Sequence, residues 1–129
     1  MKMVDWEKLT MQDLLDALKK LVKSDFEGKH VFDVTVFDDD GNEQEKVGII
    51  VEPGNVEMVD GESGEDDAVV FHIKKNAIET MKAMQVEGLD AAMRFMFDGS
   101  IYTTNPAGAQ AWFEIFEIGE EPLTKALEG

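Results

Sequence analysis

The chain has 129 residues, 43% hydrophobic and 31% charged, and we expect it to bury one core as a single domain over residues 1–129. Its 28 acidic and 12 basic residues give a formal net charge of −16, which argues against nucleic-acid binding and against electrostatic docking on anionic membranes. The absence of cysteine excludes disulfides, thiolate metal sites and thiol nucleophiles.

Targeting signals are missing from the sequence pattern. Apolar runs extend over only a few residues, far short of the roughly 20 that span a bilayer. The first ten residues lack the apolar region of a signal peptide. We therefore expect a cytoplasmic protein with at most transient membrane contact. Solubility explains the acidic excess, and adaptation to a salt-rich cytosol explains it equally well.

The first predicted element is an amphipathic helix over residues 11–23. Leu14, Leu18 and Leu21 recur at helical spacing, and polar residues occupy the opposite face. Thr10 suits the N-cap position, and Asp13 lies in the first turn, where the helix dipole favours an anion.

The period then changes to the alternation typical of strands. We predict strands over 30–37, 44–52, 56–59 and 68–73, joined by turns at 38–42 and 53–55 and by the acidic loop 61–67. Short connections between successive strands indicate an antiparallel meander.

Helical periodicity returns after residue 74. It predicts one helix ending near Gly88, a second from Leu89 to about residue 97, and a strand over 100–104. A last helix is expected to begin at Pro106 with Asn105 as its cap, and the tail from Pro122 is expected to be loosely attached. Strands followed by helices indicate the α+β class, with the helices gathered on one face of one sheet.

The acidic turn at residues 38–43 does not match a calcium loop. Placing Gly41 at the glycine of an EF-hand loop puts Val36 and Val47 at its first and last ligand positions. Neither side chain binds calcium, so a hairpin turn is the better interpretation. The loop GESGEDD is likewise interpreted as solvated.

The two histidines, His30 and His72, lie in predicted strands without a partner motif. The sequence contains no nucleophile elbow, no P-loop and no dinucleotide-binding motif. We therefore predict no catalytic, cofactor-binding or metal-ligating residue, and no enzymatic activity.

The stretch from Leu89 to Ile118 is unusually rich in large apolar side chains. Two interpretations stay open for it and for the helix before it. Methionines and aromatic residues fill irregular gaps in an ordinary core, and they also line adaptable apolar pockets.

The order of elements resembles that of the sterol carrier protein-2 family. The resemblance rests on the strand–helix junction VVFHIKKNAIETMKAM and on AAMRFMFDGSIYTTNPAG, where Ala92, Phe95, Met96 and Gly99 fall near the alanine, phenylalanine, methionine and glycine of the family. The family's lysine-rich fifth strand is here SIYTT, and Asn105-Pro106 replaces its closing glycine. The chain ends Leu127-Glu128-Gly129, which is not a peroxisomal signal. Specificity for sterol and a peroxisomal location are therefore not carried over.

The resemblance implies a five-stranded, mainly antiparallel sheet covered on one face by about four to five helices. It also implies non-enzymatic binding or transfer of a fatty acyl chain, sterol or similar lipid in a tunnel between sheet and helices. The residues expected to line that tunnel are Ile78, Met81, Met84, Met93, Met96, Phe97, Ile101, Trp112, Phe113 and Phe116.

Within this picture Met93, Met96 and Phe97 form a fixed wall, and the helix carrying Trp112 is a movable lid. The alternative is a filled core of the same fold. The protein would then act through contacts with another protein, or through self-association of an exposed apolar helix into a homodimer.

Overall fold

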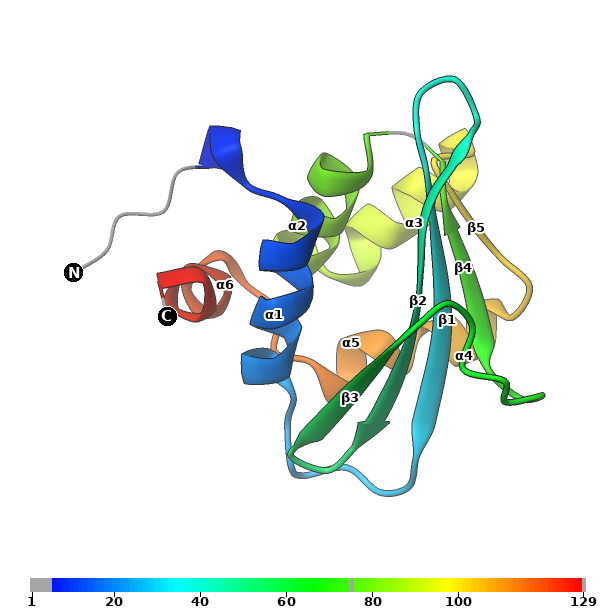
Figure 1. Cartoon of the computed structure of the whole chain (residues 1–129). Coiled ribbons are helices and arrows are strands. Elements are labelled where there is room, and N and C mark those ends of the chain that lie inside the picture. Colours follow the sequence, from blue (N-terminus) through cyan, green and yellow to red (C-terminus); the bar gives the residue numbers. More distant parts are fainter. Residues whose placement is uncertain (1–5, 75, 129) are drawn as a thin grey trace.

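The computed structural model describes residues 6–74 and 76–128. Five strands and seven helical segments follow one another along these residues (Figure 1). In chain order they are η1 (Trp6–Lys8), α1 (Met11–Leu21), β1 (His30–Phe37), β2 (Glu43–Glu52), β3 (Asn55–Asp60), β4 (Val69–Ile73), α2 (Ala77–Glu87), α3 (Leu89–Asp98), β5 (Ile101–Thr103), α4 (Pro106–Ala109), α5 (Trp112–Ile115) and α6 (Glu120–Glu128).

The strands form one open sheet in the order β3-β2-β1-β4-β5. Strand β1 pairs antiparallel with β2 and parallel with β4, while the β2–β3 and β4–β5 pairs are antiparallel. The predicted α+β class and the mainly antiparallel five-stranded sheet are confirmed. The predicted meander is wrong at its fourth strand, because β4 lies beside β1 rather than beside β3.

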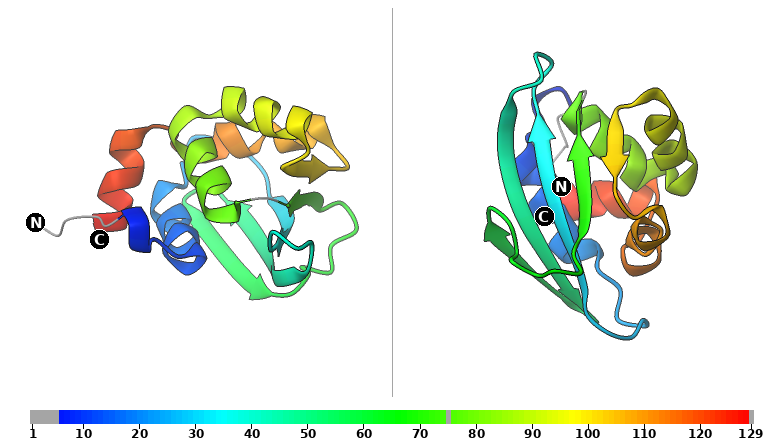
Figure 2. Two further views of the ribbon diagram at one scale, coloured as in Figure 1. Left: turned by 90° about the horizontal axis from the view of Figure 1, so that it is seen from above. Right: turned by 90° about the vertical axis from the view of Figure 1, so that its right-hand side faces the viewer.

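The loop from Gly61 to Ala68 explains this topology, since it crosses the open face of the sheet from β3 to β4 (Figure 2, right). The Ser63 backbone N–H donates to the Asp33 carboxylate at 2.8 Å. Gly48 lies beneath, where an added Cβ would come within 2.8 Å of the Ser63 nitrogen. A bare backbone at Gly48 therefore gives the loop room to cross.

The opposite face of the sheet carries the core. Phe32, Val34, Ile49, Val51 and Phe71 are buried there against the helices, which lie to the left of the sheet and behind it in Figure 1. The expectation that helices gather on one face is confirmed. Burial of such side chains provides most of the stabilisation of a fold of this kind.

Helix α1 has the predicted start. The Thr10 hydroxyl accepts from the Asp13 N–H at 3.1 Å, and the Asp13 carboxylate accepts from the Thr10 N–H at 3.0 Å, which forms a capping box. The helix ends at Leu21, two residues before the predicted end. The Lys23 N–H donates instead to the carbonyl of Ile115.

The C-terminal segment differs from its prediction. The helix expected after Pro106 is two four-residue helices, α4 and α5, followed by an extended Phe116 that bridges to Val22. Helix α6 then packs against α1. Leu123 is buried in that contact with 1% of its surface exposed, so the tail is firmly attached where loose attachment was predicted.

Candidate functional site

Four of the predicted tunnel residues meet around a small enclosed cavity between the sheet and the helices. Met81, Met84, Ile101 and Trp112 line it together with Val34, Phe71 and Ile73. The cavity volume is about 10 Å³, close to the smallest space that holds one water molecule. In this conformation the interior is filled by side chains.

Trp112 lies at the centre of that interior, with 1% of its surface exposed. Its ring packs at 5.1 Å from Phe32, 5.8 Å from Phe71 and 4.8 Å from Phe116, measured between ring centroids. Such edge-to-face and tilted pairs are favourable beyond the area that they bury. The predicted tunnel residues Trp112 and Phe116 are thus core residues in this conformation, and Trp112 is anchored from several sides.

A polar group that sequence reasoning missed accompanies the tryptophan. The Trp112 indole N–H donates to the Gln85 side-chain oxygen at 2.6 Å, and Gln85 is itself buried. The Gln85 Nε2 has no hydrogen-bond partner among the described residues. A polar residue within an apolar helical stripe was the available signal, because a buried amide is costly unless it has a partner.

The predicted wall on α3 lies elsewhere. Met93 is 58% exposed and Phe97 is 96% exposed, so neither side chain lines the interior. Helix α3 turns Ala91 and Ala92 inward instead, because small residues let it approach its neighbours closely. Of the remaining predicted residues, Met96 and Phe113 are half-buried at the edge of the core.

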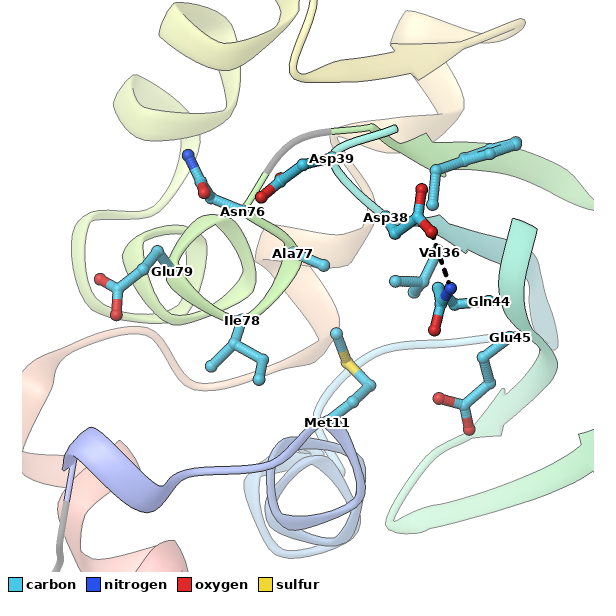
Figure 3. A pocket seen from close by; sticks show the side chains of 11 residues that line it. Met11, Val36, Asp38, Asp39, Gln44, Glu45, Asn76, Ala77, Ile78 and Glu79 are labelled. Carbon is cyan, nitrogen blue, oxygen red and sulfur yellow. Dashed lines mark hydrogen bonds between the residues drawn. The ribbon is translucent and has the colours of Figure 1, made fainter. Parts of the chain in front are cut away.

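Ile78, the last of the predicted residues, lines a different space. It borders an open groove of about 420 Å³ between the N-terminal ends of α1 and α2 and the turn that joins β1 to β2 (Figure 3). The apolar lining of the groove comes from Met11, Val36, Phe37, Ala77 and Ile78.

The groove and the cavity are both lined by residues of β1 and α2. On β1, Val36 borders the groove and Val34 borders the cavity. On α2, Ile78 borders the groove and Met81 the cavity. Residues two apart in a strand or three apart in a helix share a face and lie about 5–7 Å apart along it. The groove and the cavity are therefore bordered by neighbouring side chains on the same face of β1 and of α2.

The polar lining of the groove is acidic. Asp38, Asp39, Glu45 and Glu79 border it with Gln44 and Asn76. The Asp38 carboxylate accepts from the backbone N–H groups of Asn42 at 2.8 Å and Asp40 at 3.0 Å. These hydrogen bonds, that of Asn42 foremost, hold the pKa of Asp38 below its usual value. The acidic turn thus stabilises itself, and no described group of three or more His, Asp or Glu side chains is placed to hold a metal ion.

His72 lies on the open face of the sheet and is not one of the residues that line the groove. Its ring is 5.4 Å from that of Phe37 and 5.6 Å from that of Tyr102. Partial burial lowers the pKa of His72, and the charges of Lys74 and Lys46 lower it further. His30, at the start of β1, packs its ring against Phe26 at 5.6 Å.

No helix in the described residues is long and apolar enough to cross a membrane. No protein-family model and no curated protein matches the chain. Among solved structures, the fold is similar to that of a double mutant of the sec-alkyl sulfatase PisA1, with a TM-score of 0.62 and 15% sequence identity. The match covers 87% of this chain but only 17% of the sulfatase chain. At this identity, the likeness shows a shared fold.

Proposed function

We propose that the protein is a non-enzymatic binding or carrier module for a small molecule with a long apolar tail. The observation that carries the proposal is the alignment of the open groove with the interior cavity along β1 and α2. A ligand would enter at the groove beside Ile78 and push its tail past Met81 towards Trp112. The sequence suggested the same kind of ligand. It placed the wall of the site on α3, whereas the route proposed here begins at the groove beside Ile78.

Binding by this route requires the interior to rearrange. A tail of about eight methylene groups would gain roughly 6 kcal/mol from leaving water, at about 0.8 kcal/mol per group. That gain must exceed the cost of moving the intervening side chains and of ordering the ligand. Methionine is unbranched and adapts to irregular shapes, and Met81 and Met84 stand where the tail would pass.

The sulfatase with a similar fold guides the choice of probes. Its name refers to substrates with an alkyl chain, the type of apolar tail proposed here. Because this chain spans only a small part of the sulfatase, the activity of the whole enzyme is not transferred. Alkyl compounds are nevertheless suitable first ligands to test.

The test compares two identical substitutions in opposite surroundings. Met81→Phe would fill the route between groove and cavity, whereas Met93→Phe changes an exposed side chain on the neighbouring helix. Native mass spectrometry of delipidated protein with added dodecanol or dodecyl amphiphiles would count bound molecules. Fluorescence of Trp112, read in a Trp6→Phe background, would report on the interior.

We expect one amphiphile bound to the parent and to the Met93→Phe variant, and at least about tenfold weaker binding to Met81→Phe. If the parent takes up no alkyl compound and its Trp112 fluorescence does not change, the carrier function is excluded. Equal binding by both variants would place the ligand elsewhere.

The second candidate is an interaction module that acts through α3. The observation that favours it is the exposure of Phe97 and Met93, which flank Arg94 on the same helix surface. Exposed apolar patches frequently mark protein contacts. Sedimentation of the parent beside a Met93→Ser/Phe97→Ser variant tests self-association through this surface. A dimer that dissociates in the variant would support it, and a monomer at all concentrations would exclude self-association.

A further inference from the structure

We propose that the groove selects amphiphiles with a positively charged head group, such as long-chain alkylammonium compounds, over fatty acids and alkyl sulfates. The inference deepens the proposed function and rests on it, since it concerns the head group of a ligand whose tail enters beside Ile78. It comes from the charged residues in the described lining of the groove, which are all acidic.

The first step is the charge of the groove lining. Four carboxylates, those of Asp38, Asp39, Glu45 and Glu79, border the groove, and its described lining includes no lysine or arginine. They come from different elements: Asp38 and Asp39 from the turn after β1, Glu45 from β2, and Glu79 from α2 (Figure 3). In Figure 3 the Glu79 carboxylate points away from the other groove residues, so a head group at the mouth of the groove meets negative charge mainly on the side of the β1–β2 turn.

The second step weighs a feature of the described lining that favours an anion. The N-terminal end of α2, an 11-residue helix, opens onto the groove, and its N-cap Asn76 makes no side-chain capping hydrogen bond. A helix N-terminus carries the equivalent of roughly half a positive charge. Four full negative charges outweigh it severalfold, and the acidity of the whole chain acts in the same direction.

The third step asks whether the groove suits a bare metal ion or the charged head group of an amphiphile. The floor of the groove is apolar, formed by Met11, Val36, Ala77 and Ile78, and it offers no ligand to a hard cation. Both carboxylate oxygens of Asp38 already accept hydrogen bonds, one from the N–H groups of Asn42 and Asp40 and the other from the Gln44 amide at 3.0 Å. Diffuse negative charge above an apolar floor matches an ammonium group on an alkyl chain.

One further feature distinguishes this end of the molecule. Asn76 has a left-handed backbone conformation with φ 45°, and it is the non-glycine residue with positive φ in the described chain. Asparagine is among the few residue types that adopt this conformation readily, so the chain can turn sharply into α2 at this point.

The experiment measures three ligands with the same tail by isothermal titration calorimetry, each below its micelle concentration: dodecyltrimethylammonium, dodecanoate and neutral dodecanol. We expect dodecyltrimethylammonium to bind at least about tenfold more tightly than dodecanoate at low ionic strength, with dodecanol in between. The difference should shrink as salt increases, because exposed charges are screened.

Two triple variants with equal net charge show whether the groove is responsible. Asp39→Asn/Glu45→Gln/Glu79→Gln neutralises the lining but keeps Asp38, which holds the turn. Glu57→Gln/Glu114→Gln/Glu117→Gln removes three exposed charges outside the groove. We expect the first variant to lose most of the preference for ammonium over carboxylate. The second should retain the preference, and circular dichroism at the same ligand concentrations confirms that each variant stays folded.

The outcomes separate this inference from the proposed function. Dodecanol binding that Met81→Phe blocks, combined with equal affinity for ammonium and carboxylate, overturns the head-group selection and leaves the carrier function standing. Tighter binding of dodecanoate, or an equal loss of preference in both triple variants, also overturns the selection. Absence of binding by all three ligands removes both proposals.

Discussion

Helices α2 and α3 are neighbours in the chain, similar in length and equally rich in methionine, yet they have opposite surroundings. Met81 and Met84 on α2 are buried against the sheet beside Trp112, whereas Met93 on α3 is largely exposed and Phe97 almost completely so. Gly88 joins the two helices with a positive φ of 76°, and the chain changes direction there. Residue type is therefore a poor guide to which helix borders the interior.

The difference lies in what each helix offers its neighbours. Helix α3 packs through Ala91 and Ala92, so its large side chains are left on the outer surface. Helix α2 packs through its large residues and through the Gln85–Trp112 hydrogen bond. Ligand binding by the proposed route requires the packing of α3 to stay rigid and the side chains of α2 to rearrange.

The largest effect is expected at the aromatic centre of the core. Trp112→Ala removes a side chain that packs against Phe32, Phe71 and Phe116, so the free energy of unfolding should fall by about 3–5 kcal/mol. Phe97→Ala should change it by no more than about 0.5 kcal/mol. Urea unfolding followed by circular dichroism measures both. A comparable loss in Phe97→Ala would mean that α3 is covered in solution.

An intermediate effect is expected at Gln85. Gln85→Leu leaves the Trp112 indole N–H buried without its acceptor, which should reduce the free energy of unfolding by about 1–3 kcal/mol. Trp112→Phe combined with Gln85→Leu removes both polar partners. A double-mutant cycle should therefore show coupling of about 0.5–3 kcal/mol. Additive effects would indicate that the hydrogen bond contributes nothing beyond packing.

The smallest effect is expected on the open face, where His72 is only partly covered. Its pKa is lower in the folded chain than in the unfolded chain, so the unfolded state binds more protons as the pH falls. The folded state should thus lose stability from about pH 7 to about pH 5. His72→Gln should show a smaller loss over that interval, measured by urea unfolding at each pH. An equal loss would assign the pH dependence to other groups.

Much of the fold could be predicted from local pattern. The ends of β1 and the Thr10 cap follow from alternation and from capping chemistry, which depend on neighbouring residues alone. The place of β4 beside β1 could not, because it depends on Gly48 and Asp33 accommodating a loop that is distant in the sequence. Hydrophobic periodicity likewise located the stripe on α3 without indicating which side of the helix would face the core.

The candidate site could likewise be predicted only in part from local sequence pattern. Met81, Met84, Ile101 and Trp112 were predicted and do line the interior cavity. The groove was not anticipated, because it joins residues from the start of α1, the β1–β2 turn and the start of α2. Only the tertiary structure brings those three places together.

The contact between α6 and α1 has a consequence for the synthesis of the chain. Leu123 lies in α6, which packs against α1, a helix made about a hundred residues earlier. In the same way, β1 cannot complete its pairing until its parallel neighbour β4 has been made. Contacts between distant residues slow folding. While the nascent chain emerges, the part of α1 that α6 covers stays open until α6 is made, whereas α2 and β3 pack against other parts of α1 earlier. Uncovered apolar surface of this kind makes a chain prone to aggregation and to binding by chaperones.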